Sequence, residues 1–304
     1  MASAREIRRR IKSVKNIAQV TRALQAVSAS KARRAQEAVL ATRAYAQAAW
    51  KILTDLARQV GAPSELHPLL EQRPIKTLGV VLISGDRGLC GAFNYNLVRA
   101  AVGFLKTQDA PVKVVSVGRK GRELMWRRGF RIVREFSGLP AAPSVVDVRA
   151  IARAAIDGYL SGEFDMVCLV YAEFINTLIQ RPVVKRLLPL KMTELETQAM
   201  SHHAVVARPE QAAIDYIYEP SPREILDVII PRFTELQIYQ AVLESLASEH
   251  SARMVAMRNA SESAQDLVGT LTLRYNKARQ QGITSELLDI AGGAEALSRA
   301  TARA

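Results

Sequence analysis

The sequence has few cysteines and no uninterrupted apolar run long enough to cross a membrane. Its two cysteines, Cys90 and Cys168, are far apart and in no C-x-x-C spacing, which predicts two reduced thiols. No stretch approaches the roughly eighteen apolar residues that would predict a membrane-spanning helix. The first residues lead into charged sequence without an apolar core, so we expect no secretory signal. With 304 residues, 49% apolar and 23% charged, the composition excludes a disordered tail and favours one or two domains with real cores.

Glycine and proline are absent from residues 1–60, and acidic residues are scarce there, with three Asp or Glu against thirteen Lys or Arg. Because glycine costs roughly 1 kcal/mol and proline roughly 3 kcal/mol in a helix interior, their absence favours one continuous helix. A helix of that length would measure about 80 Å, so it needs an antiparallel partner or another protein. Its expected contact stripe advances in steps of three and four residues. The stripe comprises Ile7, Ile11, Val14, Ile17, Val20, Leu24 and Val27, then the smaller Ala32, Ala35, Ala38 and Val39.

The other end of the chain contains a matching pattern. No proline follows Pro231, and residues 232–304 carry eight residues of each charge sign. The periodic positions are Ile238, Val242, Leu246, Met254, Met257, Ala264, Leu267, Leu271 and Ala278. We expect Gly292 and Gly293 to interrupt the helix near its end. The simplest architecture is an antiparallel coiled coil of an N-terminal helix over 1–60 and a C-terminal helix over 220–304.

Between these helices, short apolar runs alternate with helical patterns, which predicts an α/β domain over about 75–215 built from βαβ units. Strands are expected at 78–83, 112–117, 131–136 and 166–171, and helices at about 94–106, 120–127 and 146–160. Residues 191–213 are polar and weakly patterned, which predicts a surface loop.

A glycine-rich segment, 84–94, follows the first of these strands and is the most tempting candidate for a phosphate site. Its glycines are spaced G-x-x-G-x-x-G, which differs from the dinucleotide fingerprint, and no G-K-[ST] follows. A tight strand-to-helix turn is the favoured interpretation. Cys90 lies in the same segment, but the four histidines are remote in sequence, so it is expected to be a packing residue. His202 and His203 form no metal-ligand spacing with other residues. We therefore predict no catalytic residue, no cofactor site and no metal site.

The basic N-terminal helix, with Arg8, Arg9 and Lys12, leaves several interpretations open. A solvated face is the plainest one. Phosphate neutralisation would favour a nucleic acid, but aromatics for stacking are missing until Tyr45 and Trp50. A membrane-surface helix would need bulky apolar residues along its whole length, where alanine takes over here. An acidic protein partner fits at least as well.

Three motifs give the sequence a strong resemblance to the gamma subunits of F-type ATP synthases, and the resemblance covers nearly the whole chain. The opening helix carries the first motif at 7–16 and 20–24, and D-R-G-L-C-G at 86–91 is the central one. The closing segment matches at 247–257, 271–280 and 283–286. Small departures include Leu24, where the family often has methionine, and Asp289, where it usually has glutamate. Neither cysteine lies in the inserted regulatory segment of chloroplast forms, so thiol regulation is not expected.

The resemblance implies a coiled coil inside a hexamer of three alpha and three beta subunits. It also implies a Rossmann-like central domain that rests, with the epsilon subunit, on the membrane ring of c subunits. Such a chain makes no bond itself: it rotates and drives the beta-subunit sites through different affinities for ADP, phosphate and ATP. We therefore expect no nucleic-acid partner, membrane association only through the c-ring, and a place on the cytoplasmic face of a bacterial plasma membrane, with no transit peptide.

The resemblance also assigns partner contacts to particular residues. Arg279 and Gln280 are the implied polar contacts to a beta-subunit loop, with Thr284 near them. Arg8, Arg9 and Lys12 would face acidic beta-subunit loops. The apolar tip would turn as a bearing in an apolar sleeve, and it comprises Leu287, Leu288, Ile290, Ala291, Ala294 and Leu297. Two competing hypotheses stay open: a nucleotide-dependent enzyme built on the α/β domain, and a basic coiled-coil nucleic-acid binder.

Overall fold

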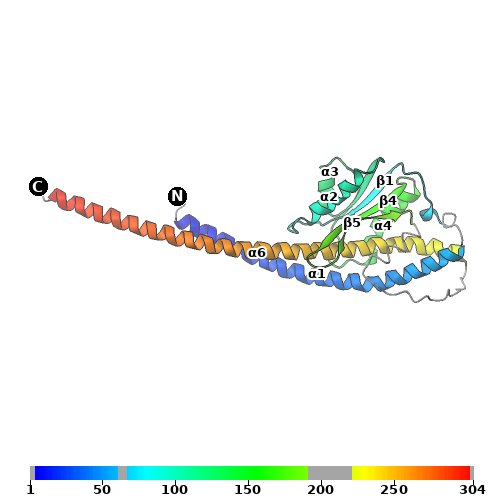
Figure 1. Ribbon diagram of the computed structural model, residues 1–304, viewed down its shortest axis with the longest axis horizontal. Coiled ribbons are helices and arrows are strands. Elements are labelled where there is room, and N and C mark those ends of the chain that lie inside the picture. Colours follow the sequence, from blue (N-terminus) through cyan, green and yellow to red (C-terminus); the bar gives the residue numbers. More distant parts are fainter. Residues whose placement is uncertain (1–3, 61–66, 191–220, 302–304) are drawn as a thin grey trace. The chain divides into compact units, whose positions relative to one another are not determined.

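The computed structural model describes residues 4–60, 67–190 and 221–301 (Figure 1). The elements follow in the order α1 (Ala4–Val60), η2 (Pro68–Leu70), β1 (Leu78–Ile83), α2 (Phe93–Leu105), β2 (Val112–Val117), α3 (Arg119–Trp126), β3 (Arg131–Phe136), α4 (Val145–Leu160), β4 (Met166–Phe174), β5 (Gln180–Leu188) and α6 (Pro222–Thr301). The predicted fold class is confirmed: two long terminal helices enclose, in sequence, a Rossmann-like α/β sheet. The loop predicted at 191–213 lies outside the described residues, so the limits of a domain over 75–215 stay a prediction.

The sheet has the strand order β3-β2-β1-β4-β5. β1 lies at its centre and pairs in parallel with β2 and β4, and β2 pairs in parallel with β3. All six residues of β1 are buried, as expected for a parallel strand that is covered on both faces. The four predicted strands are present, β4 being three residues longer than expected.

The fifth strand, β5, was missed by the sequence analysis. It pairs with β4 in antiparallel fashion at the edge of the sheet. Its sequence contains Arg181, Pro182, Lys185 and Arg186, so it lacks the continuous apolar run of a buried strand. An edge strand tolerates both charges and proline because one side of its backbone has no neighbouring strand.

Helices cover both faces of the sheet. On one face, α4, η2 and the first part of α6 form a core with side chains of β1 and β2, such as Val81 and Val115. On the other face, α2 and α3 enclose Val80, Leu82 and Val114. Alternate residues of the same strand therefore serve opposite cores, as the pleat of a strand requires.

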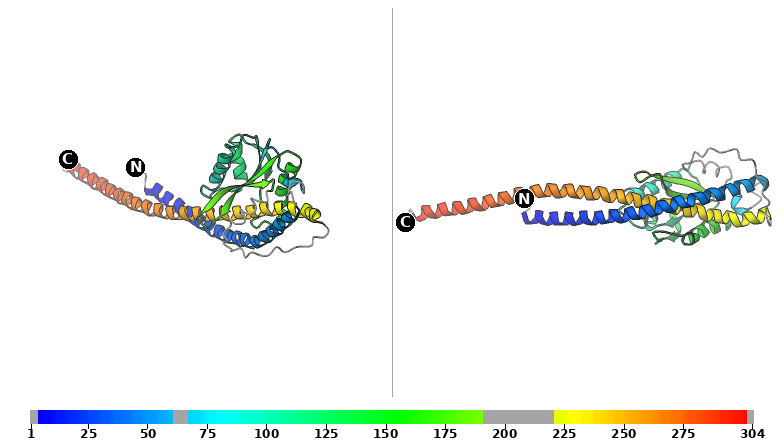
Figure 2. Two further views of the ribbon diagram at one scale, coloured as in Figure 1. Left: turned by 45° about the vertical axis from the view of Figure 1, so that its right-hand side comes forward. Right: turned by 90° about the horizontal axis from the view of Figure 1, so that it is seen from below.

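The chain divides into two compact units, and the two long helices pass through both. One unit comprises residues 1–27 and 256–304, and the other comprises 28–255. In each unit a stretch of α1 lies beside a stretch of α6 (Figure 2). In the second unit, small side chains allow close contact: Ala35 and Val39 of α1 pack against Leu243 and Ala247 of α6.

In the first unit, the less exposed positions advance in alternating steps of three and four residues, the repeat of a coiled coil. On α1 they are Ile7, Ile11, Val14, Ala18 and Thr21, and on α6 they are Met257, Ser261, Ala264, Val268, Leu271, Tyr275 and Ala278. The Ser261 hydroxyl donates to the carbonyl of Ala18 across the two helices at 3.5 Å.

The predicted contact stripe is wrong at four positions. Ile17, Val20 and Val27 of α1 and Leu267 of α6 are exposed. The seam instead uses neighbouring small or polar residues, among them Ala18 and Thr21. Thr21 fits an apolar seam because its hydroxyl donates to carbonyls of its own helix, at 3.0 Å to Ile17 and 3.1 Å to Ala18.

One further expectation about α6 is wrong, because the helix continues through Gly292 and Gly293. The helix also contains Pro231 in its interior. A proline removes one backbone hydrogen bond from a helix, but here the neighbouring residues Ile230 and Phe233 are buried in the core, which stabilises the turn. Among the described helices, none is long and apolar enough to span a membrane.

Candidate functional site: exposed helix surfaces and a buried junction

The eight residues predicted to contact partners lie in the first unit, in two groups. Arg8, Arg9 and Lys12 are exposed on α1, and the remaining five are exposed on α6. That second group comprises Arg279, Gln280, Thr284, Leu287 and Ile290. Within this group the Thr284 hydroxyl donates to the carbonyl of Gln280, one turn earlier on the same helix, at 2.9 Å. Whether these side chains contact partners stays a prediction.

The α6 surface around these residues is apolar yet open to solvent. Every residue from 279 to 295 is exposed, including Leu287 at 61% and Ile290 at 70%. Ile283, Leu287 and Ile290 follow the spacing of one helix face. The side chain of Leu297, which was also assigned to the tip, is not described. Exposed apolar side chains that gather on one face mark an interaction surface.

A second exposed apolar stripe lies on α1. Ile17, Val20 and Val27 are each more than half exposed, and the exposed cations Lys12 and Lys15 precede them on the same helix. This stripe is distinct from the seam that faces α6. One helix therefore carries two apolar faces, of which one packs on α6 and the other is exposed in the described part of the chain.

The central motif, 86–91, forms the loop between β1 and α2. The Asp86 carboxylate accepts from the backbone N–H of Arg119 at 3.1 Å and of Gly138 at 2.8 Å. The Ser84 hydroxyl donates to the carbonyl of Val117 at 3.0 Å and accepts from the N–H of Gly121 at 2.9 Å. These bonds fix the carboxyl ends of three strands to one another.

A glycine is required at position 118, where the chain that leaves β2 passes close to Ser84 at the end of β1. Its φ is +93°, and a Cβ there would lie 2.1 Å from the carbonyl oxygen of Ser84. Both the conformation and the space exclude any larger side chain.

A buried ion pair on α6 joins this loop to the long helix. Arg253 donates to the Glu249 carboxylate at 2.5 Å, and both side chains are nearly enclosed. Arg253 also donates to the carbonyls of Gly88 at 3.3 Å and Arg87 at 3.4 Å. The Glu249 carboxylate lies against Gly85, where a Cβ would approach its Cδ to 2.8 Å. We call Glu249, His250, Arg253 and the loop 85–91 the junction.

Burial raises the pKa of Glu249, while Arg253 opposes the shift. The neighbouring His250 has its pKa lowered to about 4, first by burial and then by Arg253 and by Lys31 of α1. Nδ1 of His250 lies 3.2 Å from a guanidinium nitrogen of Arg253. A proton on that ring would place two positive groups side by side, which explains why Arg253 lowers the pKa of His250.

The junction argues against a phosphate site in the glycine-rich segment. The loop presents the carbonyls of Arg87 and Gly88 to Arg253, and the Glu249 carboxylate would repel an anion. The N–H of Gly85 is already bonded to the Asn94 side chain at 2.9 Å. The strand-to-helix turn was therefore the better interpretation of this segment.

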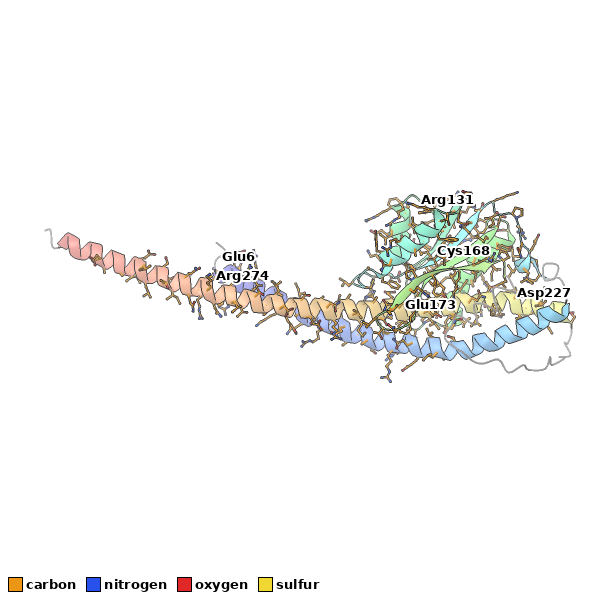
Figure 3. All side chains as sticks on the ribbon, viewed as in Figure 1. Glu6, Arg131, Cys168, Glu173, Asp227 and Arg274 are labelled. Carbon is orange, nitrogen blue, oxygen red and sulfur yellow. The ribbon has the colours of Figure 1, made fainter. Side chains whose placement is uncertain are left out.

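Both cysteines are buried, with Cys168 inside the sheet unit (Figure 3). Burial raises the pKa of Cys90, and it raises that of Cys168 to about 11. Neither thiol is thus poised as a thiolate nucleophile. His202 and His203 lie outside the described residues. In the described part of the chain, no group of three His, Cys, Asp or Glu side chains is placed to hold a metal ion.

Glu249, His250 and Arg253 lie in the closing motif at 247–257, but no contact was predicted for them from the sequence. Glu249 and Arg253 stand four residues apart, which on a helix usually indicates a solvated surface pair. The G-x-x-G-x-x-G loop could have indicated that this pair is buried, because its small residues leave room for a helix to approach closely.

Comparison with known proteins supplies the family. The family model described as ATP synthase matches residues 3–297. The chain is 49% identical to the ATP synthase gamma chain of Herpetosiphon aurantiacus, over 98% of this chain and 100% of that one. It is 47% identical to the ATP synthase gamma chain of Chloroflexus aurantiacus, with the same coverage.

A solved structure of the Euglena gracilis mitochondrial ATP synthase, described as OSCP/F1/c-ring in rotational state 3, contains a similar fold. The TM-score is 0.65 at 21% identity, over 97% of this chain and 94% of that one. At this identity the likeness is one of fold.

Proposed function

Because this chain belongs to the gamma-chain family of ATP synthase, we propose that it is the central rotary shaft of a proton-translocating enzyme. The shaft couples rotation of a membrane c-ring to ATP synthesis and hydrolysis at beta-subunit sites, and so regulates ATPase activity and proton flow. It carries no catalytic residue of its own. Its partners are three alpha and three beta subunits, an epsilon subunit and the c-ring. It works at the cytoplasmic face of a bacterial plasma membrane, which it reaches only through that ring.

The observation that carries this proposal is the exposed apolar surface at the end of α6. An 80-residue helix whose leucines and isoleucines face solvent over 283–290 gains stability only when another protein covers them. Non-directional apolar contacts have no fixed partner atom, so they allow rotation inside a sleeve. Directional polar contacts, by contrast, hold the helix at particular angles.

Coupling requires contacts that differ between states of the partner, because a ligand shifts an equilibrium only by its differential affinity. The two terminal helices are suited to this role since they are asymmetric. α1 presents Arg8, Arg9 and Lys12, whereas the tip of α6 presents mainly apolar residues. Basic groups on α1 would meet acidic loops of the surrounding subunits. Each rotational position would then offer a different surface to each beta subunit.

We expect Arg279→Ala to reduce proton-driven ATP synthesis by the assembled enzyme about tenfold, the effect of losing an arginine anchor in an interface. Arg274→Ala is the matched control, since Arg274 is an exposed arginine on the same helix. The measurement is ATP synthesis in inverted membrane vesicles under an imposed proton gradient. Normal synthesis with Arg279→Ala, or an equal loss with Arg274→Ala, would remove Arg279 from the contact.

A further inference from the structure

A surface groove lies between α3 and β3, outside the regions used above. Its volume is about 660 Å³, and its lining residues are Arg122, Glu123, Trp126 and Arg127 of α3 with Ile132, Val133, Arg134 and Glu135 of β3. Two neighbouring residues of this strand serve opposite faces of the sheet, since Ile132 packs against the core on the α2 and α3 face and Val133 packs against the core on the α4 face. A groove that touches all four must therefore run along the edge of the strand.

That edge is free in the described part of the chain. β3 is the terminal strand of the sheet and pairs with β2 alone. Its outer side carries backbone N–H and C=O groups that can pair with an added strand. At six residues, the edge is about 20 Å long, enough for a short extended segment. Figure 3 places Arg131, at the start of β3, on the opposite side of the sheet unit from Glu173 and Asp227.

The surroundings of the groove are strongly basic. Residues 119–135 include seven Lys or Arg and two Glu, and both glutamates are already paired. Glu123 bonds to Lys120 at 3.1 Å and to Arg127 at 2.6 Å, and Glu135 bonds to Arg122 at 3.3 Å. The excess positive charge favours an acidic occupant.

Trp126 gives the groove an apolar anchor. It is 71% exposed, although a tryptophan gains most from burial. Charged side chains and the irregular register of β3 against β2 are ordinary protection for a sheet edge. An exposed tryptophan adds nothing to such protection, and exposed aromatic anchors of this kind are enriched in binding surfaces.

We propose that this groove binds an extended, acidic segment of a partner protein, which adds a strand to β3 and packs an apolar side chain on Trp126. A nucleic acid suits the groove less well, because Glu123 and Glu135 line it and it offers a single aromatic contact. All residues that line the groove lie in the unit 28–255, so peptide binding there can be measured independently of the rotary role. A chain that does not bind the peptide could still act as the rotary shaft, and a chain that is not the shaft could still bind the peptide.

The test uses a fluorescein-labelled heptapeptide of alternating Glu and Val and the full chain, followed by fluorescence anisotropy at about 0.15 M ionic strength, where the Debye length is about 8 Å. Saturable binding is expected, weakened about tenfold or more by Arg127→Glu through charge reversal at the groove and about tenfold by Trp126→Ala. The matched control is Arg99→Glu, an exposed arginine on α2 that does not line the groove, with an expected change below about twofold because salt screens charges that lie outside the contact.

A second peptide of the same sequence, methylated on every backbone nitrogen, tests strand addition without changing the protein. It cannot donate to the edge of β3, so we expect its binding to fall about tenfold or more. Equal binding of both peptides, or equal losses with Arg99→Glu and Arg127→Glu, would overturn the proposal and leave only diffuse charge attraction. Trp126-dependent binding of an oligothymidine in place of the peptide would overturn it in favour of a nucleic-acid site.

Discussion

Replacing Arg253 by methionine is expected to lower the free energy of unfolding by about 3–5 kcal/mol at neutral pH, as when one partner of a buried ion pair is removed. The substitution leaves Glu249, which is 7% exposed, without its guanidinium. It also leaves the carbonyls of Arg87 and Gly88 without the donor that now reaches them. The methionine retains most of the apolar length of the arginine, so the loss reports the polar contacts of the junction.

The decrease in the free energy of unfolding caused by Arg253→Met should be larger at neutral pH than at acidic pH. Burial already raises the pKa of Glu249, and Arg253 opposes that shift, so the substitution raises the pKa further. A carboxyl group whose pKa is raised in the folded state contributes stability at acidic pH, and this contribution is lost as pH rises through the folded-state pKa. Arg253→Met should therefore be least harmful below the ordinary glutamate pKa and most harmful at neutral pH.

Urea denaturation of the purified chain at pH 4 and pH 7 measures both effects. Arg258→Met is the matched control, because Arg258 forms an exposed pair with Glu262 at the same spacing on the same helix. Exposed pairs of this kind contribute under about 0.5 kcal/mol. If the two substitutions cost the same, or if the cost of Arg253→Met does not change with pH, the junction does not stabilise the fold as described.

His250 should make the folded chain sensitive to acid. Its pKa is lowered to about 4 in the folded state, against an ordinary value near 6.5. The unfolded chain therefore binds a proton first as the pH falls. Stability present above pH 6.5 is lost progressively down to pH 4, by about 3 kcal/mol in total.

Replacing His250 by glutamine should remove this loss and make the variant less sensitive to acid than the parent chain. The free energy of unfolding at pH 7 and pH 4.5 gives the comparison. Glu249 and His67, whose pKa values are also shifted, are present in both proteins and cancel in the difference. Parallel acid profiles for the two proteins would show that His250 is not held neutral by its surroundings.

The sequence predicts the sheet well because the central strands are buried on both faces and read as short apolar runs. β1 and β2 are found at their predicted limits. β5 could not be recognised, because its charges and Pro182 are tolerated only at the edge of a sheet, and the edge position depends on the pairing of the whole domain. The family resemblance was available from three motifs without any structure.

The phase of the coiled coil was harder to predict. Apolar size favours Ile17, Val20 and Val27 as the contact stripe, but the seam uses Ala18, Thr21 and other small residues that let two helices approach closely. α1 carries two overlapping apolar patterns, and periodicity alone cannot tell which one faces α6. The junction was missed for a related reason, since a Glu–Arg pair at helical spacing looks identical whether exposed or buried.

The proposed rotary role requires that other subunits enclose this chain, and reconstitution with cognate alpha and beta subunits tests this requirement most directly. The measurement is ATP hydrolysis by those subunits with and without this chain, after size exclusion chromatography of the mixture. We expect a complex near three alpha, three beta and one copy of this chain, with faster turnover than alpha and beta subunits alone. Elution of the chain by itself, with hydrolysis unchanged, would contradict the rotary role.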